Sequence, residues 1–323
     1  MKLKFLSAIC FFFTSFSASA DGYDQYVNSK GQVSDVVVEC LSLSGIVIEG
    51  EKREQNWPEP LYTLSSQNLE GVVKVVQGKA DPEISWFRKG ERWNMENPLL
   101  SLSTAQKILV LGQQEFGFSK PVYPKEKNYE GILVLGAAAG RVYERVLFTN
   151  EIVKRGTTFN DIYILTGKRS LEDFEKEAFP YLKEIDDEGP MMKGIIEKEA
   201  LPVFKNKAIL VYSEPPEGSK RATTESTVHA FMDSNPKPGK YLCVSNGIYV
   251  PYQELVIQNA LDKHYPKAGI SVECVGPANP EMLSEASDED VINKASVFLD
   301  NLSRILYNLQ IQKELKNDLE EKA

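Results

Sequence analysis

The stretch GILVLGAAAGRVYERVLF, residues 131–148, decides the fold. An apolar run of strand length ends at a small-residue loop between Gly136 and Gly140, and Arg141 then begins a segment with helical spacing. A buried strand, a tight turn and a helix in this order are typical of the first unit of a parallel α/β sheet. The stretch therefore predicts the start of such a sheet. It also predicts a loop at the carboxyl end of the strand, where ligands of such sheets bind.

Strand and helix signals continue to alternate after this unit. The strand segments are continuous apolar runs, as expected when helices cover both faces of a parallel sheet. The further strands are DIYILTG (161–167), KAILVYS (207–213), YLCVSNG (241–247) and ISVECVG (270–276), and the helices are 141–155, 187–199, TTESTVHAFMD (223–233) and PYQELVIQNAL (251–261). The sequence therefore predicts a doubly wound, mostly parallel, five-stranded Rossmann-like α/β fold.

The remaining chain is predicted to form four parts. Residues 1–20 are a signal peptide, 21–100 a β-containing region, 101–313 the α/β domain with a C-terminal helix, and 314–323 a solvated tail. In the second part, VVVECLSLSGIVIEG and GVVKVVQG are predicted as strands because they alternate or run apolar over short lengths between glycines and prolines. Its tryptophans either pack within this layer, the interpretation we favour, or form a ligand platform; they are Trp57, Trp86 and Trp93.

Two helices flank the α/β pattern. The first is predicted from a cap at Ser103 to about Glu115. The last is predicted to begin at Ser287, with Asp290 as a capping partner. Its apolar stripe predicts that it docks on the sheet rather than forming a coiled coil, since a coiled-coil seam needs a sustained heptad pattern.

The first twenty residues indicate export. Lys2 and Lys4 precede an apolar stretch over 5–13, and the leader ends in a small-residue cleavage pattern before Asp21. Cys10 follows the bulky Ile9, which argues against a lipid anchor. No later segment has the roughly 20 apolar residues of a membrane-spanning helix. The chain is therefore predicted to be periplasmic or secreted.

Charge and composition argue against two classes of site. Removing the leader takes away two lysines and no acidic residue, so the formal net charge falls from -9 to -11. Without a basic cluster, nucleic-acid binding is disfavoured. The two histidines, His229 and His264, lie far apart in the sequence and no C-x-x-C occurs, so a zinc site of Cys and His is not expected. The mature cysteines are interpreted as buried thiols in preference to a disulfide; they are Cys40, Cys243 and Cys274.

The strand-to-helix junctions are rich in basic and hydroxyl side chains although the chain is acidic. Ligands of open α/β sheets bind outside the carboxyl ends of the strands. The residues there that we expect to bind an anionic small molecule are Gly136, Gly140, Arg141, Thr166, Gly167, Arg169, Arg221, Thr223, Ser245 and Asn246. The alternative is that the glycine loop is a packing turn and the Ser and Thr residues are helix caps.

Candidates for catalysis are few. Glu188, before a predicted helix, and Glu225, in the Thr-rich loop, are the candidate general bases if burial raises their pKa near a substrate. Exposed glutamates at helix starts otherwise only complement the helix dipole. The G-x-S-x-G signature of lipase-like serine hydrolases does not occur.

From about residue 130 to 275 the order of motifs resembles the SanA, ElyC and YdcF family of bacterial envelope proteins. The shared features are Leu135-Gly136, Arg141, Thr166-Gly167, Glu188, and Thr223-x-Glu225 in place of the family's Thr-x-Glu-Asn. Ser226 replaces that Asn, and the family's later His and Arg fall near Val250 and Tyr252 or Gln253. The resemblance implies a Rossmann-like domain, a role in the cell envelope and, from one branch, a nucleotide or S-adenosylmethionine cofactor.

These observations leave two hypotheses of different classes. In the first, an exported envelope protein binds a phosphate-containing ligand at the sheet edge and acts on an envelope precursor. In the second, the same scaffold is a non-catalytic module for an envelope or host-facing protein partner. The sequence does not decide whether the protein is an enzyme.

Overall fold

The structure, a computed structural model, describes residues 23–50, 60–81, 84–87, 100–219, 221–279 and 287–321. The predicted signal peptide and two of the tryptophans, Trp57 and Trp93, lie outside these residues.

A five-stranded sheet forms the centre of the α/β part, and all of its strands are parallel. Its order is β5-β4-β3-β6-β7. The strands are β3 (Asn128–Leu135), β4 (Thr158–Gly167), β5 (Ala208–Ser213), β6 (Gly239–Val244) and β7 (Ile270–Val275). The chain starts at the centre, moves outward to β5, and returns to place β6 on the other side of β3. The predicted doubly wound fold is confirmed, and the strand order reverses between β3 and β6.

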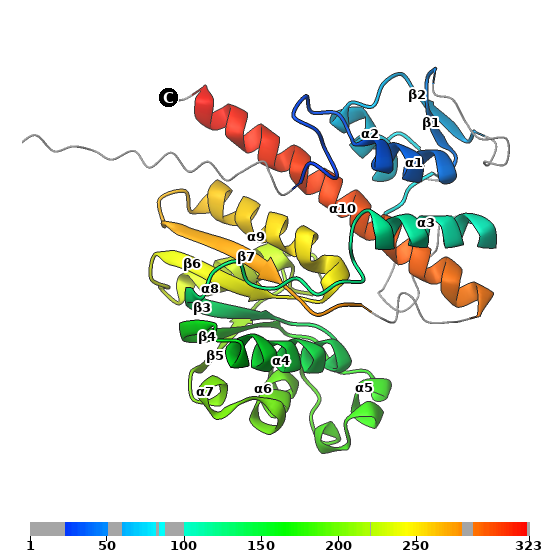
Figure 1. The fold of residues 1–323 in the computed structure, drawn as a ribbon. Helices are drawn as coiled ribbons and strands as arrows, with labels where there is room; N and C mark the ends of the chain where they lie inside the picture. The colour runs from blue at the N-terminus through cyan, green and yellow to red at the C-terminus, as the bar shows by residue number, and fades with distance from the viewer. Residues whose placement is uncertain are drawn as a thin grey trace, which may run out of the picture.

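Helices cover both faces of this sheet, as the continuous apolar strands predicted (Figure 1). One face carries α4 (Ala139–Lys154) and α6 (Glu188–Glu199), and the other carries α8 (Thr224–Asp233) and α9 (Val250–His264). The short elements of this part are α5 (Asp173–Ala178), η2 (Pro180–Leu182), α7 (Pro202–Lys205) and η3 (Gly247–Tyr249).

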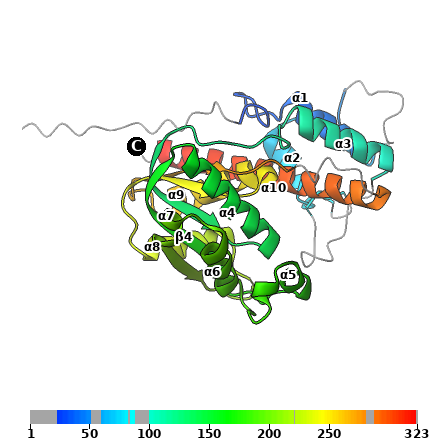
Figure 2. The ribbon, with the colours of Figure 1, turned by 60° about the horizontal axis from the view of Figure 1, so that its bottom comes forward.

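The last helix, α10 (Asp288–Glu320), is the longest helix among the described residues. It begins as predicted, with the Ser287 side chain accepting a hydrogen bond from the Asp290 amide. It continues past the predicted end at Lys313, and its last residues are mostly exposed. The predicted docking on the sheet is wrong: α10 packs mainly on α9, α3 and α2, because α9 already covers that face of the sheet (Figures 1 and 2).

Both predicted N-terminal strand segments contain a helix where strand was expected. VVVECLSL lies in α1 (Asp35–Leu43), and VVKVV lies in α2 (Leu69–Val76). The IVI segment does form β1 (Ile46–Ile48), which pairs in parallel with β2 (Tyr62–Leu64). The second sheet is therefore small, and helices supply most of the N-terminal layer.

Caps and packing explain why these valine-rich runs are helical. The Ser34 side chain accepts from the Val37 amide at the start of α1, and the Asn68 side chain accepts from the Glu70 amide at the start of α2. Such caps satisfy amides that a helix start leaves without partners. Burial against neighbouring helices then outweighs the strand preference of valine, which is a weak and context-dependent effect.

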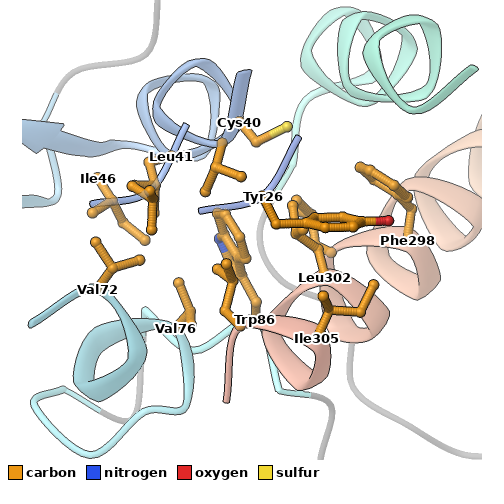
Figure 3. Packing of buried hydrophobic residues seen from close by; sticks show 14 of the residues in the cluster. Tyr26, Cys40, Leu41, Ile46, Val72, Val76, Trp86, Phe298, Leu302 and Ile305 are labelled. Carbon is orange, nitrogen blue, oxygen red and sulfur yellow. The ribbon is translucent and has the colours of Figure 1, made fainter. Parts of the chain in front are cut away.

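The N-terminal layer shares one apolar core with α10. Side chains from α1, β1 and α2 meet Phe298, Leu302 and Ile305 of α10 (Figure 3). Trp86 is buried here and its indole N–H donates to the Ser44 hydroxyl oxygen at 2.9 Å. For Trp86, the predicted packing role is confirmed. The helix α3 (Leu102–Gln114) joins the same core, and its cap is Ser101 rather than the predicted Ser103.

The three described cysteines are buried free thiols, as predicted. Cys243 and Cys274 lie opposite each other on β6 and β7, and Cys40 lies in α1. Burial raises the pKa of both Cys40 and Cys274, so neither thiol is an activated nucleophile.

Candidate functional site

A cleft of about 950 Å³ lies at the carboxyl ends of β3 and β4, next to the point where the strand order reverses. Its walls come from the start of α4, the loop before α8, η3 with the start of α9, and α10. Six basic side chains line it against three acidic ones; they are Arg141, Arg145, Lys168, Arg169, Arg221 and Arg304, with Glu144, Glu188 and Asp300. The cleft wall therefore has a basic excess in a chain of net charge -9.

The loop GAAAGR forms one wall of the cleft. A side chain at Gly136 would place its Cβ 2.2 Å from Glu188 Oε1, so this glycine lets the carboxylate lie against the strand end. A Cβ at Gly140 would meet nothing within 4 Å. The packing of the protein thus requires Gly136 but leaves open space beside Gly140.

The loop leads into the N-terminus of α4, which is only partly capped. Its cap residue, Ala138, offers no side-chain hydrogen bond. The Ala139 amide donates to Glu175 Oε1 at 2.8 Å. Gly140 is exposed and lines the cleft. A helix N-terminus attracts anions through its dipole and its amides. Here the first amide, that of Ala139, is already bound to the Glu175 carboxylate, while Gly140 lies at the cleft.

Arg141 lies on the cleft wall at the same helix start. Its guanidinium is 4.9 Å from the centre of the Tyr249 ring. Among the described residues, no carboxylate forms an ion pair with it. An arginine stacked on an aromatic ring keeps its edge donors for a phosphate or carboxylate.

Arg169, predicted as a ligand residue, reaches the cleft wall but is engaged inside the protein. Its Nε donates to Glu188 Oε2 at 2.8 Å, and its Nη1 and Nη2 donate to the two carboxylate oxygens of Glu175 at 2.7 and 2.9 Å. Burial opposes ionisation of Glu175, but the Arg169 hydrogen bonds and the amides of Glu172 and Ala139 outweigh it and lower the pKa of that carboxyl. Arg169 therefore orders the two carboxylates.

Glu188 is mostly buried and lines the cleft. Besides Arg169, its carboxylate accepts from the Thr166 hydroxyl at 3.2 Å and from the Gly167 amide at 3.4 Å. A carboxylate has about four lone-pair sites, so these three donors leave room for one more. Glu188 can accept a hydrogen bond from a hydroxyl or amino group in the cleft. Thr166 is buried and is not part of the cleft wall.

Ser245 and Asn246, also predicted as ligand residues, lie behind the wall. Asn246 Oδ1 accepts from Arg145 Nε at 2.8 Å, and its Nδ2 donates to Glu144 Oε2 at 2.6 Å. Ser245 is fully buried, and its hydroxyl has no hydrogen-bond partner among the described residues. Arg145 also donates to the carbonyl oxygens of Leu135 and Gly136, so it ties the ends of β3 and β6 together. Sequence reasoning missed Arg145, although it lies one helical turn after Arg141.

The loop before α8 places Arg221 and Thr223, two of the predicted ligand residues, on the cleft wall. The Thr223 hydroxyl accepts from the Ser226 amide at 3.0 Å, and the Ser226 hydroxyl accepts from the Thr223 amide at 2.9 Å. In this capping box, side chains of the protein accept hydrogen bonds from the backbone amides at the start of α8. A Cβ at Gly167 would lie 2.6 Å from Ala222 Cβ, so Gly167 lets this loop approach β4.

Glu225, the other candidate base, does not line the cleft. Its Oε1 lies 2.9 Å from His264 Nε2 and 3.7 Å from Lys263 Nζ. The hydrogen bond with His264 lowers the pKa of Glu225, the opposite of the change that a general base near neutral pH needs. The structure also brings the two histidines together, which the sequence did not predict.

Helix α10 supplies a wall that sequence reasoning missed. Arg304 Nε and Nη2 donate to the two carboxylate oxygens of Asp300 at 3.0 and 3.1 Å, and both residues line the cleft. The guanidinium of Arg304 is also 5.9 Å from the centre of the Tyr252 ring. These residues follow the last strand along the chain, so no strand-to-helix junction pointed to them.

No family model matches the chain, and comparisons with curated proteins and with solved structures give no match. The resemblance to the SanA, ElyC and YdcF family thus stays an expectation that rests on the residues quoted for it. Among the residues that the structure describes, none of the helices has the length and apolar character needed to cross a membrane.

Proposed function

We propose that the cleft binds a small ligand that carries an anionic group, above all phosphate, together with a hydroxyl or amino group. The proposal rests on one observation: the cleft is lined by a basic excess and also by the Glu188 carboxylate. Arg141 and Arg221 line the cleft together with Gly140, which has open space beside it. Glu188 lines the same cleft, and its carboxylate has room for one more donor.

The two parts of the cleft suit different parts of such a ligand. A phosphate at the start of α4 would gain the helix dipole and charge-assisted hydrogen bonds from arginine. A hydroxyl or amino group of the ligand that reaches Glu188 would donate to its carboxylate. Sugar phosphates and nucleotides combine both groups, so they are the ligand classes that this arrangement favours.

The cellular setting of the proposal is the bacterial envelope. It rests on the predicted signal peptide at 1–20 and on the family resemblance, which are both consistent with an exported protein. The ligand would then be a phosphorylated or glycosylated precursor of an envelope polymer. A nucleotide or S-adenosylmethionine cofactor is proposed from the resemblance alone.

If the ligand is turned over, Glu188 is the residue we propose as general base, because it lines the cleft and Glu225 does not. A second candidate function is a non-catalytic binding module. It is favoured by the ion pairs that engage both carboxylates, Glu188 with Arg169 and Glu225 with His264.

A thermal-shift series on residues 21–323 against phosphates, nucleotides, S-adenosylmethionine and cell-wall sugar phosphates tests the binding proposal. A ligand at a hundredfold excess over its dissociation constant adds about 2.7 kcal/mol of stability. Arg141→Ala is expected to weaken binding by about 10- to 100-fold, the effect of losing a hydrogen bond to a charged group, with the melting temperature of the free protein unchanged.

The matched control is Lys154→Ala, which removes an exposed positive charge from the other end of the same helix. It should bind like the unmodified chain. If Arg141→Ala and Lys154→Ala weakened ligand binding equally, the effect would come from net charge alone. If no compound shifted the melting temperature, the proposal would be contradicted. Products in the incubated samples, followed by mass spectrometry, separate turnover from binding alone.

A further inference from the structure

The only two histidines of the chain lie side by side on the surface. His229 is in α8 and His264 is the last residue of α9, and the two ring centres are 4.7 Å apart. Glu225 lies one helical turn before His229 on α8, so both side chains project from the same face of that helix. Packing of α8 on α9 completes the cluster.

We infer that Glu225, His229 and His264 form a binding site for a divalent transition-metal ion, with zinc as the preferred metal. One ligand atom from each residue can be chosen so that all three lie within 4.8 Å of one another. Tetrahedral zinc at about 2.0–2.1 Å from its ligands holds them about 3.3 Å apart. Small side-chain rotations that move these atoms by about an ångström bring them to that spacing.

The chemistry of the three groups suits zinc. Two imidazoles and one carboxylate form a ligand set used by zinc sites that keep a fourth position open. Magnesium and calcium prefer oxygen ligands, and the cysteine thiols, which would favour softer metals, are buried elsewhere. The side chains of Glu225 and His264 are 47% and 32% exposed, so an ion and a water molecule can reach them.

A hydrogen bond orients one of the imidazoles for this role. His229 Nδ1 lies 2.7 Å from the Tyr265 hydroxyl. When Nδ1–H donates to that oxygen, Nε2 carries the lone pair that a metal needs, the usual arrangement behind metal-binding histidines. The neighbouring Lys263 ammonium, 3.7 Å from Glu225, is the competing cation, and it is exposed enough to move away.

The inference is independent of the proposed ligand cleft, since none of these three residues lines it. An ion bound here would connect α8 with the end of α9. Because a ligand that binds only the folded state stabilises it, zinc should also raise the melting temperature.

Calorimetric titration of ZnCl₂ into residues 21–323, without a histidine tag and after treatment with EDTA, tests the site. These residues include all that the structure describes. We expect one equivalent of zinc to bind. His229→Gln and His264→Gln should each weaken binding by more than about 100-fold, because even the loss of a partner behind a ligand costs about 10- to 100-fold. Tyr265→Phe, which removes only such a partner, should weaken it by about tenfold.

The matched control is Glu197→Gln. Glu197 is an exposed helical glutamate with a lysine 3.7 Å away, as Glu225 has, but its ion pair is with Lys193 and involves no histidine. Zinc binding should be unchanged in this variant and weakened in Glu225→Gln. Absence of binding, or binding that survives both histidine substitutions, would overturn the inference. Melting curves in EDTA check that each variant is folded.

Discussion

The N-termini of α4 and α8 both border the cleft, and they differ in how their amides are satisfied. At α8, Thr223 and Ser226 form a capping box, so the protein's own side chains satisfy the helix start. At α4, Ala138 provides no side-chain cap, Glu175 takes the Ala139 amide, and Gly140 faces open space. A polar, Thr-rich loop can thus be a completed helix cap, while a loop of small residues leaves room for a ligand.

The arginines around these helix starts differ in the same way. Arg145 and Arg169 are bound by carbonyl, amide and carboxylate groups of the protein, and they hold the strand ends and two glutamates in place. Arg141 instead lies on Tyr249 at the cleft surface. The inner arginines should therefore control stability and the outer arginine should control binding.

The largest expected effect is on stability, from Arg169→Ala. This substitution leaves Glu175 and Glu188 without their shared cation, and the side chains of all three are at most 10% exposed. Removing one partner of a buried ion pair costs about 3–5 kcal/mol. Urea unfolding measures the loss. Arg155→Ala, which breaks an exposed pair with Glu151, should cost less than about 1 kcal/mol, and similar losses in the two variants would contradict the assignment of Arg169 as a buried clamp.

The next effect is a pH dependence of stability that comes from Glu175. The pKa of Glu175 is lowered in the folded state, so its ionised form stabilises the fold above the unfolded pKa of about 4.5. This contribution is lost as the pH falls through the lower, folded pKa. Glu175→Gln should therefore lose less stability than the unmodified chain between pH 6 and pH 3. Urea midpoints across this range measure the slope, and identical slopes would show that Glu175 is not held in its ionised form.

The smallest effects test the two helix starts directly. Thr223→Ala removes the cap of α8 and should cost about 1 kcal/mol with ligand affinity little changed. Gly140→Ala should leave stability unchanged or raise it by up to about 1 kcal/mol through helix propensity, yet weaken binding, because its methyl group enters the open space. Melting curves without ligand measure the stability of each variant. Melting curves with the ligand found in the thermal-shift series measure its affinity. Gly71→Ala, in α2 away from the cleft and with comparable room, is the control for propensity.

The sequence predicted the parallel sheet well because its strands are buried on both faces and their apolar runs are continuous, as in 131–135 and 241–244. It failed in the N-terminal layer, where valine-rich segments of strand length become helices. Their caps at Ser34 and Asn68 are short polar signals, and their buried faces are set by α10, which follows much later in the chain. Tertiary packing thus decided between helix and strand in these valine-rich segments, where local preference is weak.

The candidate site was predicted in part for a related reason. Strand-to-helix junctions can be read from sequence, so Gly136, Arg141, Arg221 and Thr223 were found, and all four line the cleft. Which arginine is engaged inside the protein depends on contacts over long sequence distances, as for Arg145 with Asn246. Likewise, the two histidines meet only when α8 packs on α9.

The most direct test of the central claim is the response of the two helix starts to inorganic phosphate. In ¹H–¹⁵N spectra of the protein, the Gly140 and Arg141 amide signals should shift in a saturable way as phosphate is added, while the Glu225 and Ser226 amide signals at the capped start of α8 should not. Arg141→Ala should reduce the response at Gly140. Unchanged Gly140 and Arg141 signals, or equal shifts at both helix starts, would contradict an anion site at the start of α4.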